Sequence, residues 1–294
     1  MRNKSIQTKA HQLVVCKTQH GEILHDQKPI RSIGTERAYK YCIAQFLDWR
    51  QFACLPLLGP FMETEMHEYL NDQSEILGQS ALDQHRQALQ TVFSVWLNPI
   101  CSLKNEVLQS KDLTKEQLLK VLQSQSDLTA LSTLVCLDAG LRAHELLTLK
   151  PADIQPPSAG RSWRNDLFYA RKDFREFTVL GKGGLCRRVA VSDTLAIELE
   201  LYRQHESIER TDREIHRSST FRLNGGQSFS QSFSRTSLAT LGFSLGAHCL
   251  RHIFAKNRFF ELRRADKSVG DALHIVSQEC GHFRPQITLT YLQH

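Results

Sequence analysis

The sequence has no segment that would place the protein in a membrane or outside the cell. No apolar run approaches the roughly 18 residues that a transmembrane helix requires. The stretch Met1–Lys9 is polar and lacks the hydrophobic core of a signal peptide. The eight cysteines are scattered without a CxxC pair, which argues against a zinc knuckle and against a disulfide framework. We therefore expect a cytoplasmic protein with reduced cysteines that mostly fill the core.

The positive charge of the chain is confined to its second half. The 294 residues carry a formal net charge of +6, and residues 1–139 contain 14 Lys and Arg against 15 Asp and Glu. Residues 140–294 contain 23 Lys and Arg against 16 Asp and Glu, so the whole excess lies there. This distribution suits a phosphate-rich partner, and a basic surface that only serves solubility explains it equally well.

Helical periodicity dominates the first part of the chain. Residues 1–34 read as an irregular extension, because Gly21, Pro29 and Gly34 interrupt it. From residue 35 onward apolar residues recur at helical spacing, and Pro99 ends the pattern. We therefore expect a small all-α domain over residues 35–98 and a linker over residues 99–112.

Helices and one hairpin are expected in the second part of the chain. The strings Phe177–Leu180 and Arg188–Val191 have strand composition, and Gly181-Lys182-Gly183-Gly184 between them reads as a β-hairpin turn. Residues 155–176 look like an inserted loop, and residues 218–244 look like a Ser- and Gly-rich stretch with one short helix. The fold class predicted for the chain is mainly α with a small antiparallel β-sheet.

The string His248-Cys249-Leu250-Arg251-His252 lies on a predicted helix and places His248, Arg251 and His252 on one face. Two histidines at this spacing suggest metal ligands. The glutamate of the HExxH motif is missing, however, and Arg251 would repel a cation. Arginine and histidine together suit a phosphate, because arginine presents a planar fork of donors. A helix with polar residues on its surface is the ordinary alternative.

Three further strings each carry a weak signal. Arg142 follows Gly140, where an apolar helix ends, and Glu145 stands three residues beyond Arg142. Lys182 occupies the tip of the predicted hairpin, which is not a Walker A loop because no Ser or Thr follows the lysine and strands flank it. His282 precedes Tyr291 by nine residues near the end of the sequence. A surface ion pair, a solvated turn and a docked terminus would explain these strings one by one.

Taken in order, the strings resemble the tyrosine recombinases, the family of the phage integrases. AGLRAHELLTL resembles the first arginine box of that family, GAHCLRHIFA resembles the second, and CGHFRPQITLTYL resembles the box that ends in the nucleophile. The resemblance covers residues 113–292, and the helices of residues 35–98 are similar in pattern to the core-binding domain of the family. It implies an N-terminal helical core-binding domain and a C-terminal α+β catalytic domain over residues 113–294.

The resemblance also implies a role for each matching position. Tyr291 would be the nucleophile, and Arg142 and Arg251 would bind the scissile phosphate. Proton transfer would involve Lys182, which protonates the departing 5′ oxygen, and His248, which assists. His282 would hydrogen-bond the phosphate, Glu145 would support the site, and His252 would be structural. In the basic half of the chain, Arg187 and Arg188 are expected to contact DNA.

The implied reaction is transesterification at a DNA phosphodiester through a 3′-phosphotyrosyl intermediate. Two arginines and a histidine can stabilise the charge of the transition state without a metal. A tyrosyl phosphodiester keeps the energy of the broken bond, so rejoining requires no ATP. We expect no cofactor and no metal. The implied partners are double-stranded DNA, a homotetramer on two DNA sites, and accessory DNA-bending or directionality factors, with no membrane partner and with nucleoid association when DNA is bound.

Three other functions stay open on the sequence. A type IB topoisomerase would share the chemistry of the site and relax supercoils as a monomer. A catalytically idle DNA-binding protein would keep only the fold. A metal-dependent nuclease would use His248 and His252 as ligands.

Overall fold

Two separate sets of apolar residues build two hydrophobic cores, and the chain divides accordingly into the units Met1–Leu108 and Gln109–His294. The computed structural model describes residues 2–20, 30–57, 59–104 and 112–292, without the side chains of residues 2–4, 182, 287 and 290. The division between the two units falls inside the segment predicted as a linker, residues 99–112.

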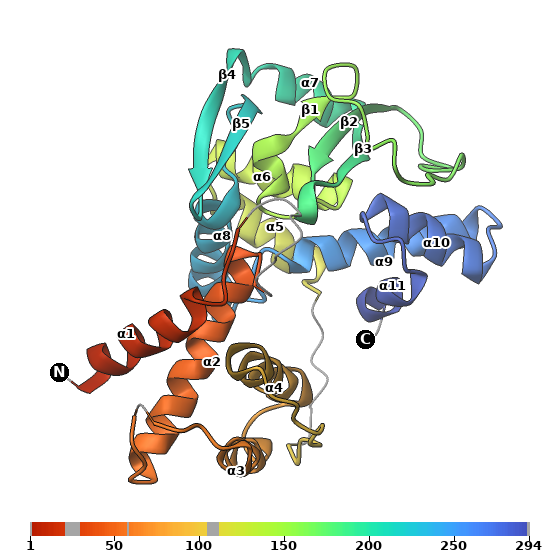
Figure 1. Ribbon diagram of the computed structural model, residues 1–294. Coiled ribbons are helices and arrows are strands. Elements are labelled where there is room, and N and C mark those ends of the chain that lie inside the picture. The colour runs from red at the N-terminus through yellow and green to blue at the C-terminus, as the bar shows by residue number, and fades with distance from the viewer. Residues whose placement is uncertain (1, 21–29, 58, 105–111, 293–294) are drawn as a thin grey trace. The chain divides into compact units, whose positions relative to one another are not determined.

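The first unit is all helical. It consists of α1 (Arg2–Val15), α2 (Ile33–Phe52), α3 (Glu63–Ser74) and α4 (Gln79–Phe93) (Figure 1). The helix α2 begins after Ser32, whose hydroxyl accepts a hydrogen bond from the backbone N–H of Thr35 at 3.0 Å. Helices α2, α3 and α4 agree with the helical periodicity of residues 35–98.

The prediction of an irregular N-terminal extension is wrong for residues 2–15, which form α1. Ile6, Ala10 and Val14 stand four residues apart, so they share one face of this helix. All three are buried in the core of the first unit, and α1 packs against α2. Burial of this apolar stripe stabilises a helix whose other side chains are mostly polar. Residues 21–29, with Gly21 and Pro29, lie outside the described residues.

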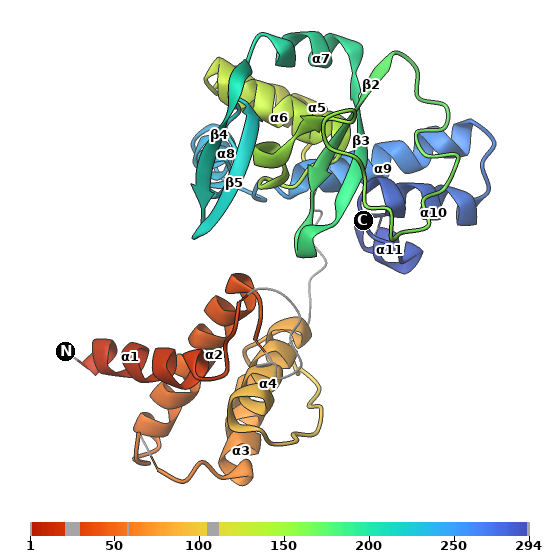
Figure 2. The same cartoon turned by 45° about the horizontal axis from the view of Figure 1, so that its top comes forward.

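The second unit combines helices with two small antiparallel sheets (Figure 2). The first sheet has the strand order β1 (Lys150–Pro151), β2 (Phe174–Leu180), β3 (Cys186–Ser192), and the second pairs β4 (Arg203–Asp212) with β5 (Ile215–Phe221). The hairpin β2–β3 turns through the short 3-10 helix Lys182–Gly184, which confirms the predicted hairpin. The second hairpin, β4–β5, was not predicted.

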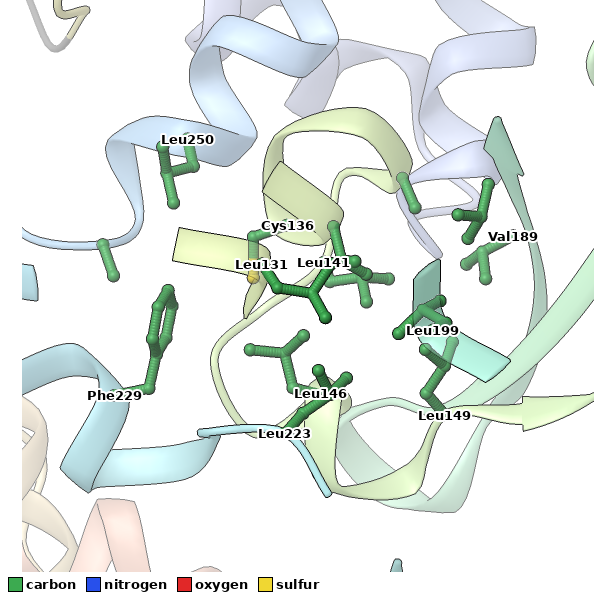
Figure 3. Packing of buried hydrophobic residues seen from close by; sticks show 14 of the residues in the cluster. Leu131, Cys136, Leu141, Leu146, Leu149, Val189, Leu199, Leu223, Phe229 and Leu250 are labelled. Carbon is green, nitrogen blue, oxygen red and sulfur yellow. The ribbon is translucent and has the colours of Figure 1, made fainter. Parts of the chain in front are cut away.

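The main core of the second unit lies between helices and sheet. It includes α5 (Lys115–Gln123), α6 (Asp127–Ala139), the 3-10 helix Glu145–Thr148, α7 (Asp193–Glu200) and α8 (Gly226–Leu241). Figure 3 shows Leu131 and Cys136 of α6 beside Leu141 and Leu146, with Phe229 of α8 on one side. Helix α8 has 16 residues, so the short helix expected within residues 218–244 is in fact a long one.

A second apolar cluster joins the last three helices. These are α9 (Cys249–Arg264), α10 (Val269–Glu279) and α11 (Pro285–Leu292). The cluster contains Phe254 from α9, Ile275 from α10 and Tyr291 from α11. Because α6 and α11 both pack against α9, the end of α6 and Tyr291, near the end of α11, are brought to the same region of the unit. Among the described residues, no helix is both long and apolar enough to cross a membrane.

Candidate active site

The end of helix α6 forms one side of the site. Gly140 has a φ of +61°, and a Cβ at this position would lie 2.3 Å from the ring of Phe254. Only glycine therefore allows the chain to turn here against α9. The turn directs the carbonyl of Gly140 toward two arginines, since it accepts hydrogen bonds from Nη2 of Arg187 at 3.2 Å and from Nη1 of Arg251.

Glu145 lies at the centre of the site and is fully buried. Its carboxylate accepts the backbone N–H of Arg142 at 2.8 Å and Nη1 of Arg142 at 2.9 Å. It also accepts Nη2 of Arg187 at 2.7 Å, and Nη1 of Arg251 lies 3.7 Å away. Burial alone would raise the pKa of this carboxyl, but the three arginines outweigh burial and hold the pKa far below its ordinary value. Glu145 is therefore the anion that gathers the three guanidinium groups.

The site contains more positive than negative charge. Three guanidiniums surround the one carboxylate of Glu145, and two of them, those of Arg187 and Arg251, are fully buried. The pKa of Arg142 is lowered, first by burial and then by the nearby charge of Arg251. One carboxylate balances only one of the three charges, and an unbalanced buried charge is costly, so this site favours the entry of an anion.

The helix α10 ends in a tight turn that presents His282. The turn needs a left-handed residue, and Gly281 supplies it with a φ of +67°. A Cβ on Gly281 would lie 2.7 Å from Cδ of Arg187, so glycine is also required for close packing. The backbone N–H of His282 donates to the carbonyl of Ser277 at 2.7 Å. The carbonyl of Cys280 accepts Nη2 of Arg251, which ties the turn to α9.

His282 contacts Arg142, and Tyr291 contacts Arg251. Nε2 of His282 lies 3.1 Å from Nη2 of Arg142 and 3.2 Å from the hydroxyl of Tyr291. The same hydroxyl accepts a hydrogen bond from Nε of Arg251 at 3.4 Å. Tyr291 itself is buried, with 7% of its surface exposed. Two guanidiniums, an imidazole and a phenol therefore share one small volume.

The contact with Arg142 decides the protonation of His282. A guanidinium can only donate, so Nε2 of His282 must be an acceptor and the imidazole is neutral, with its proton on Nδ1. Burial lowers the pKa of His282 to about 4, and the charges of Arg251 and Arg142 act in the same direction. At neutral pH the ring is therefore unprotonated at Nε2.

The two histidines of the predicted helix flank the phenol. The ring of His252 is buried and stands edge-on to the ring of Tyr291, with 4.6 Å between the centroids. His248 lies at the N-cap of α9, is exposed, and has its ring centroid 6.1 Å from that of Tyr291. Within the described residues, no group of three or more His, Cys, Asp or Glu side chains is arranged to hold a metal ion.

The structure brings together Arg142, Glu145, Arg251, His282 and Tyr291, with His248 and His252 beside them, and their roles stay predictions. Lys182 lies on the turn between β2 and β3, and its side chain is outside the described part of the chain. Arg188 is partly exposed and pairs with Glu176 on β2, and its contact with DNA also stays a prediction.

The expectation that Arg187 contacts DNA is corrected by the structure. Its side chain is fully buried and bonds to Glu145 and to the carbonyls of Gly140 and Glu279. Its donors are directed at the interior of the site, whereas the equally buried Arg251 also donates to the Tyr291 hydroxyl. The sequence contained a signal for this, because Arg187 has the same strand parity as Val189 and Val191, whose side chains face the core.

Comparison with solved structures shows which fold carries these residues. An integrase of the Tn1549 transposon, in complex with transposon right end DNA, aligns over 97% of this chain and 95% of its own, at 14% identity and a TM-score of 0.57. A lambda integrase dimer bound to a COC′ core site aligns over 97% and 96%, at 18% identity and a TM-score of 0.53. A XerH site-specific recombinase bound to difH substrate aligns over 88% and 75%, at 20% identity and a TM-score of 0.54.

The chain has the tyrosine recombinase fold. The fold class expected from the sequence, mainly α with small antiparallel sheets, is confirmed with it. No family model and no curated protein matches the sequence. Since the structural neighbours share at most one residue in five with this chain, the likeness establishes the fold, and the chemistry must be argued from the side chains described above.

Proposed function

We propose that this protein is a site-specific DNA recombinase or integrase that cuts and rejoins DNA with Tyr291 as its nucleophile. One observation carries the proposal. The hydroxyl of Tyr291 lies 3.4 Å from Arg251 and 3.2 Å from His282, and Arg142 lies 3.1 Å from the same nitrogen of His282. Groups this close to one another can all contact a single phosphate, which is the geometry that transesterification requires.

The charge balance of the site supports a phosphodiester substrate. A phosphodiester carries one negative charge, and the pentacovalent transition state carries an additional one. The surplus of guanidinium charge around Glu145 would stabilise this increase, with Arg142 and Arg251 as the donors next to the phenol. Losing one such donor typically costs about 3–4 kcal/mol of transition-state stabilisation.

Proton transfers complete the proposed reaction. The phenol of Tyr291 must lose its proton as it attacks phosphorus, and the neutral Nε2 of His282 lies within hydrogen-bonding distance of it. The phosphorus–oxygen bond to the 5′ oxygen breaks as the bond to the phenol oxygen forms, and we assign protonation of the departing oxygen to Lys182, with His248 assisting. The reverse sequence, with a 5′ hydroxyl as nucleophile, rejoins the strand and consumes no nucleotide.

Double-stranded DNA is the proposed partner, bound by a homotetramer on two sites, with accessory DNA-bending or directionality factors. The basic second half of the sequence supports DNA binding, whose affinity would fall steeply with salt. Among the structural neighbours, a lambda integrase is a tetramer bound to a Holliday junction. We place the activity in the cytoplasm, on the nucleoid when DNA is bound.

Trapping on nicked duplexes tests the proposal. The duplexes carry a nick within randomised sequence. A cut close to the nick releases a short DNA fragment, which diffuses away, so that rejoining is prevented and the covalent adduct accumulates. In the presence of EDTA, the wild-type chain should form a covalent adduct, and peptide mapping should locate this adduct on Tyr291. Tyr291→Phe should bind the same duplexes and form none, whereas Tyr169→Phe, which changes a tyrosine of the same unit, should react like the wild type. An undiminished reaction of Tyr291→Phe would refute the proposal.

The same material separates the neighbouring functions. Relaxation of a supercoiled plasmid by the monomer would favour a type IB topoisomerase. Binding without any adduct from the wild-type chain would favour an idle DNA-binding protein, and cleavage that EDTA abolishes would favour a metal-dependent nuclease.

A further inference from the structure

The loop over residues 155–176, which the sequence marks as an insertion, packs beside the site. Between β1 and β2 the chain forms no helix or strand from residue 152 to residue 173, all of which the structure describes. Part of this loop, residues 158–171, is held at both of its ends, and we name it the brace. At one end, the backbone N–H of Ser158 donates to the carbonyl of Cys186 on β3 at 3.0 Å. At the other, Arg171 donates to the carboxylate of Asp138 on α6 at 2.6 Å.

The first contact between the brace and the His282 turn is made by Gln278. Its side-chain amide forms two hydrogen bonds with the backbone of the brace. The oxygen accepts the N–H of Arg164 at 2.8 Å, and the nitrogen donates to the carbonyl of Ser162 at 3.1 Å. Because the amide of Gln278 both accepts and donates a hydrogen bond, it fixes the position and the orientation of the brace relative to the end of α10.

The second contact is made by Glu279, which is almost fully buried. Its carboxylate accepts the backbone N–H of Phe168 at 3.0 Å, and two nitrogens of Arg258 at 2.8 and 2.9 Å. Arg258 in turn donates to the carbonyl of Tyr169 at 3.0 Å. The backbone carbonyl of Glu279 accepts Nη1 of Arg187, the arginine that bonds to Glu145. One residue thus connects the brace with the interior of the site.

The third contact lies on the far side of His282 in the chain. The ring of Trp163 meets the ring of Phe283 edge to face, with 5.0 Å between the centroids, and the guanidinium of Arg161 stands 5.4 Å from the same ring. The brace therefore holds residues 278, 279 and 283, on both sides of His282. The imidazole between them must lie within about 3 Å of both Arg142 and Tyr291 to make the hydrogen bonds described above.

We propose that the brace is a positioning element, which keeps His282 in contact with Arg142 and the Tyr291 hydroxyl by fixing the chain on either side of it. The catalytic part of this inference rests on the proposed function. Among the described residues, the hydrogen bonds of the Tyr291 phenol and of the Arg142 guanidinium go to groups outside the brace, so its effect on the reaction passes through His282.

Variants of the brace can be tested first without DNA, through the titration of His282. Chains with ¹³C-labelled histidine rings give one NMR signal per histidine, and the His282 signal is the one lost in His282→Gln. The wild-type ring should titrate with a pKa of about 4, because it is buried and because the charges of Arg251, Arg142 and Arg187 outweigh the opposing charge of Glu145. In Gln278→Ala and Trp163→Ala the pKa should rise toward about 6.5, since a looser turn admits water to the ring. If the brace only stabilised the fold and did not position His282, the pKa of His282 would be the same in these variants as in the wild type.

Adduct formation on the nicked duplexes tests the consequence. In Gln278→Ala and Trp163→Ala the rate should fall about 10- to 100-fold, with DNA binding unchanged. Trp163→Phe, which keeps a ring against Phe283, should recover the rate. The matched control is Asp166→Asn, because Asp166 belongs to the brace and its carboxylate, in the described part of the chain, pairs with Arg164 and Lys267. It should cleave and titrate as the wild type.

The two readouts keep the failures apart. If the wild-type chain forms no adduct, the proposed function is wrong, and the titration still shows whether the brace positions His282. Wild-type titration and wild-type cleavage in both alanine variants would overturn the inference. An equal loss in Asp166→Asn would also overturn it, because the effect would then be a general loosening. Gln278 is partly exposed, so Gln278→Ala remains a folded test even if Trp163→Ala does not fold.

Discussion

Replacing Arg187 by methionine tests whether this arginine organises the interior of the site. The side chain donates to Glu145, to the carbonyl of Gly140 and to the carbonyl of Glu279, and none of its surface is exposed. Methionine fills a similar space with no donor. Glu145 keeps Arg142 and Arg251, and Gly140 keeps Arg251, so these acceptors stay partnered. The carbonyl of Glu279 loses this donor.

The magnitude follows from these contacts. A charge-assisted hydrogen bond to the Glu145 carboxylate is worth about 1.5–3 kcal/mol, and a buried carbonyl left without a donor costs about 1–3 kcal/mol. We expect the free energy of unfolding of the second unit to fall by about 3–5 kcal/mol, which is also the usual cost of breaking a buried ion pair. For a unit of this size, that corresponds to a melting temperature lower by roughly 6–20 °C.

Urea unfolding followed by Trp163 fluorescence measures this change, in a chain with Trp49 and Trp96 replaced by phenylalanine so that only the second unit is observed. The matched control is Arg188→Met. Arg188 is the next residue on β3. Its ion pair with Glu176 lies at the surface, because the side chains of both residues are partly exposed. A surface pair of this kind contributes about 0–1 kcal/mol. Equal stability of the two variants would refute the buried role of Arg187, and weaker DNA binding with unchanged stability would restore the surface role.

Two further predictions concern other parts of the fold. Gly140→Ala should lower the melting temperature of the second unit and abolish adduct formation, because its Cβ would meet the Phe254 ring and its φ is positive. Gly160→Ala, with open space around it, should change neither of these measurements. In the first unit, burial lowers the pKa of His85, which bonds to the Tyr69 hydroxyl at 2.7 Å. The folded state therefore resists protonation of His85. The free energy of unfolding of this unit should be highest above about pH 6.5 and should fall as the pH decreases below that value. A chain with His85→Gln should show a shallower dependence in urea unfolding measured from pH 7 to 5, and an unchanged slope would contradict the role of His85.

The sequence predicted those helices and strands that have clear turn or capping residues at their ends. The hairpin β2–β3 was predictable because a glycine-rich turn separates two strings of β-branched residues. Helix α5 was predictable from Thr114, whose side chain forms a capping box with Gln117. Helix α1 was missed although its apolar residues are spaced four apart, because they are few among polar ones. Strand β4 is largely exposed and rich in charge, and β5 is buried only toward its end, so neither strand shows an alternation that a sequence pattern could reveal.

The site was predictable to different depths. The pairing of Arg142 with Glu145 spans three residues, so helical spacing alone indicates it. The contact of Arg142 with His282 spans 140 residues, and only the resemblance to a family suggested it. The burial of Arg187 on β3 was not foreseen in spite of its strand parity, because an arginine is ordinarily exposed. The contacts of the loop after β1 were not foreseen, because charged and aromatic residues in a loop read as solvent-exposed.

By itself, the sequence determined which chemical groups are available and on which local element each one stands, because capping, turn chemistry and apolar spacing act over a few residues. Only the tertiary structure decided that Glu145 is enclosed by three arginines, and that Arg142, His282 and Tyr291 touch. Those contacts depend on how α6, α9 and α10 pack, for instance on the approach of Phe254 to Gly140. Packing of this kind is a property of the whole core, and no short stretch of sequence encodes it.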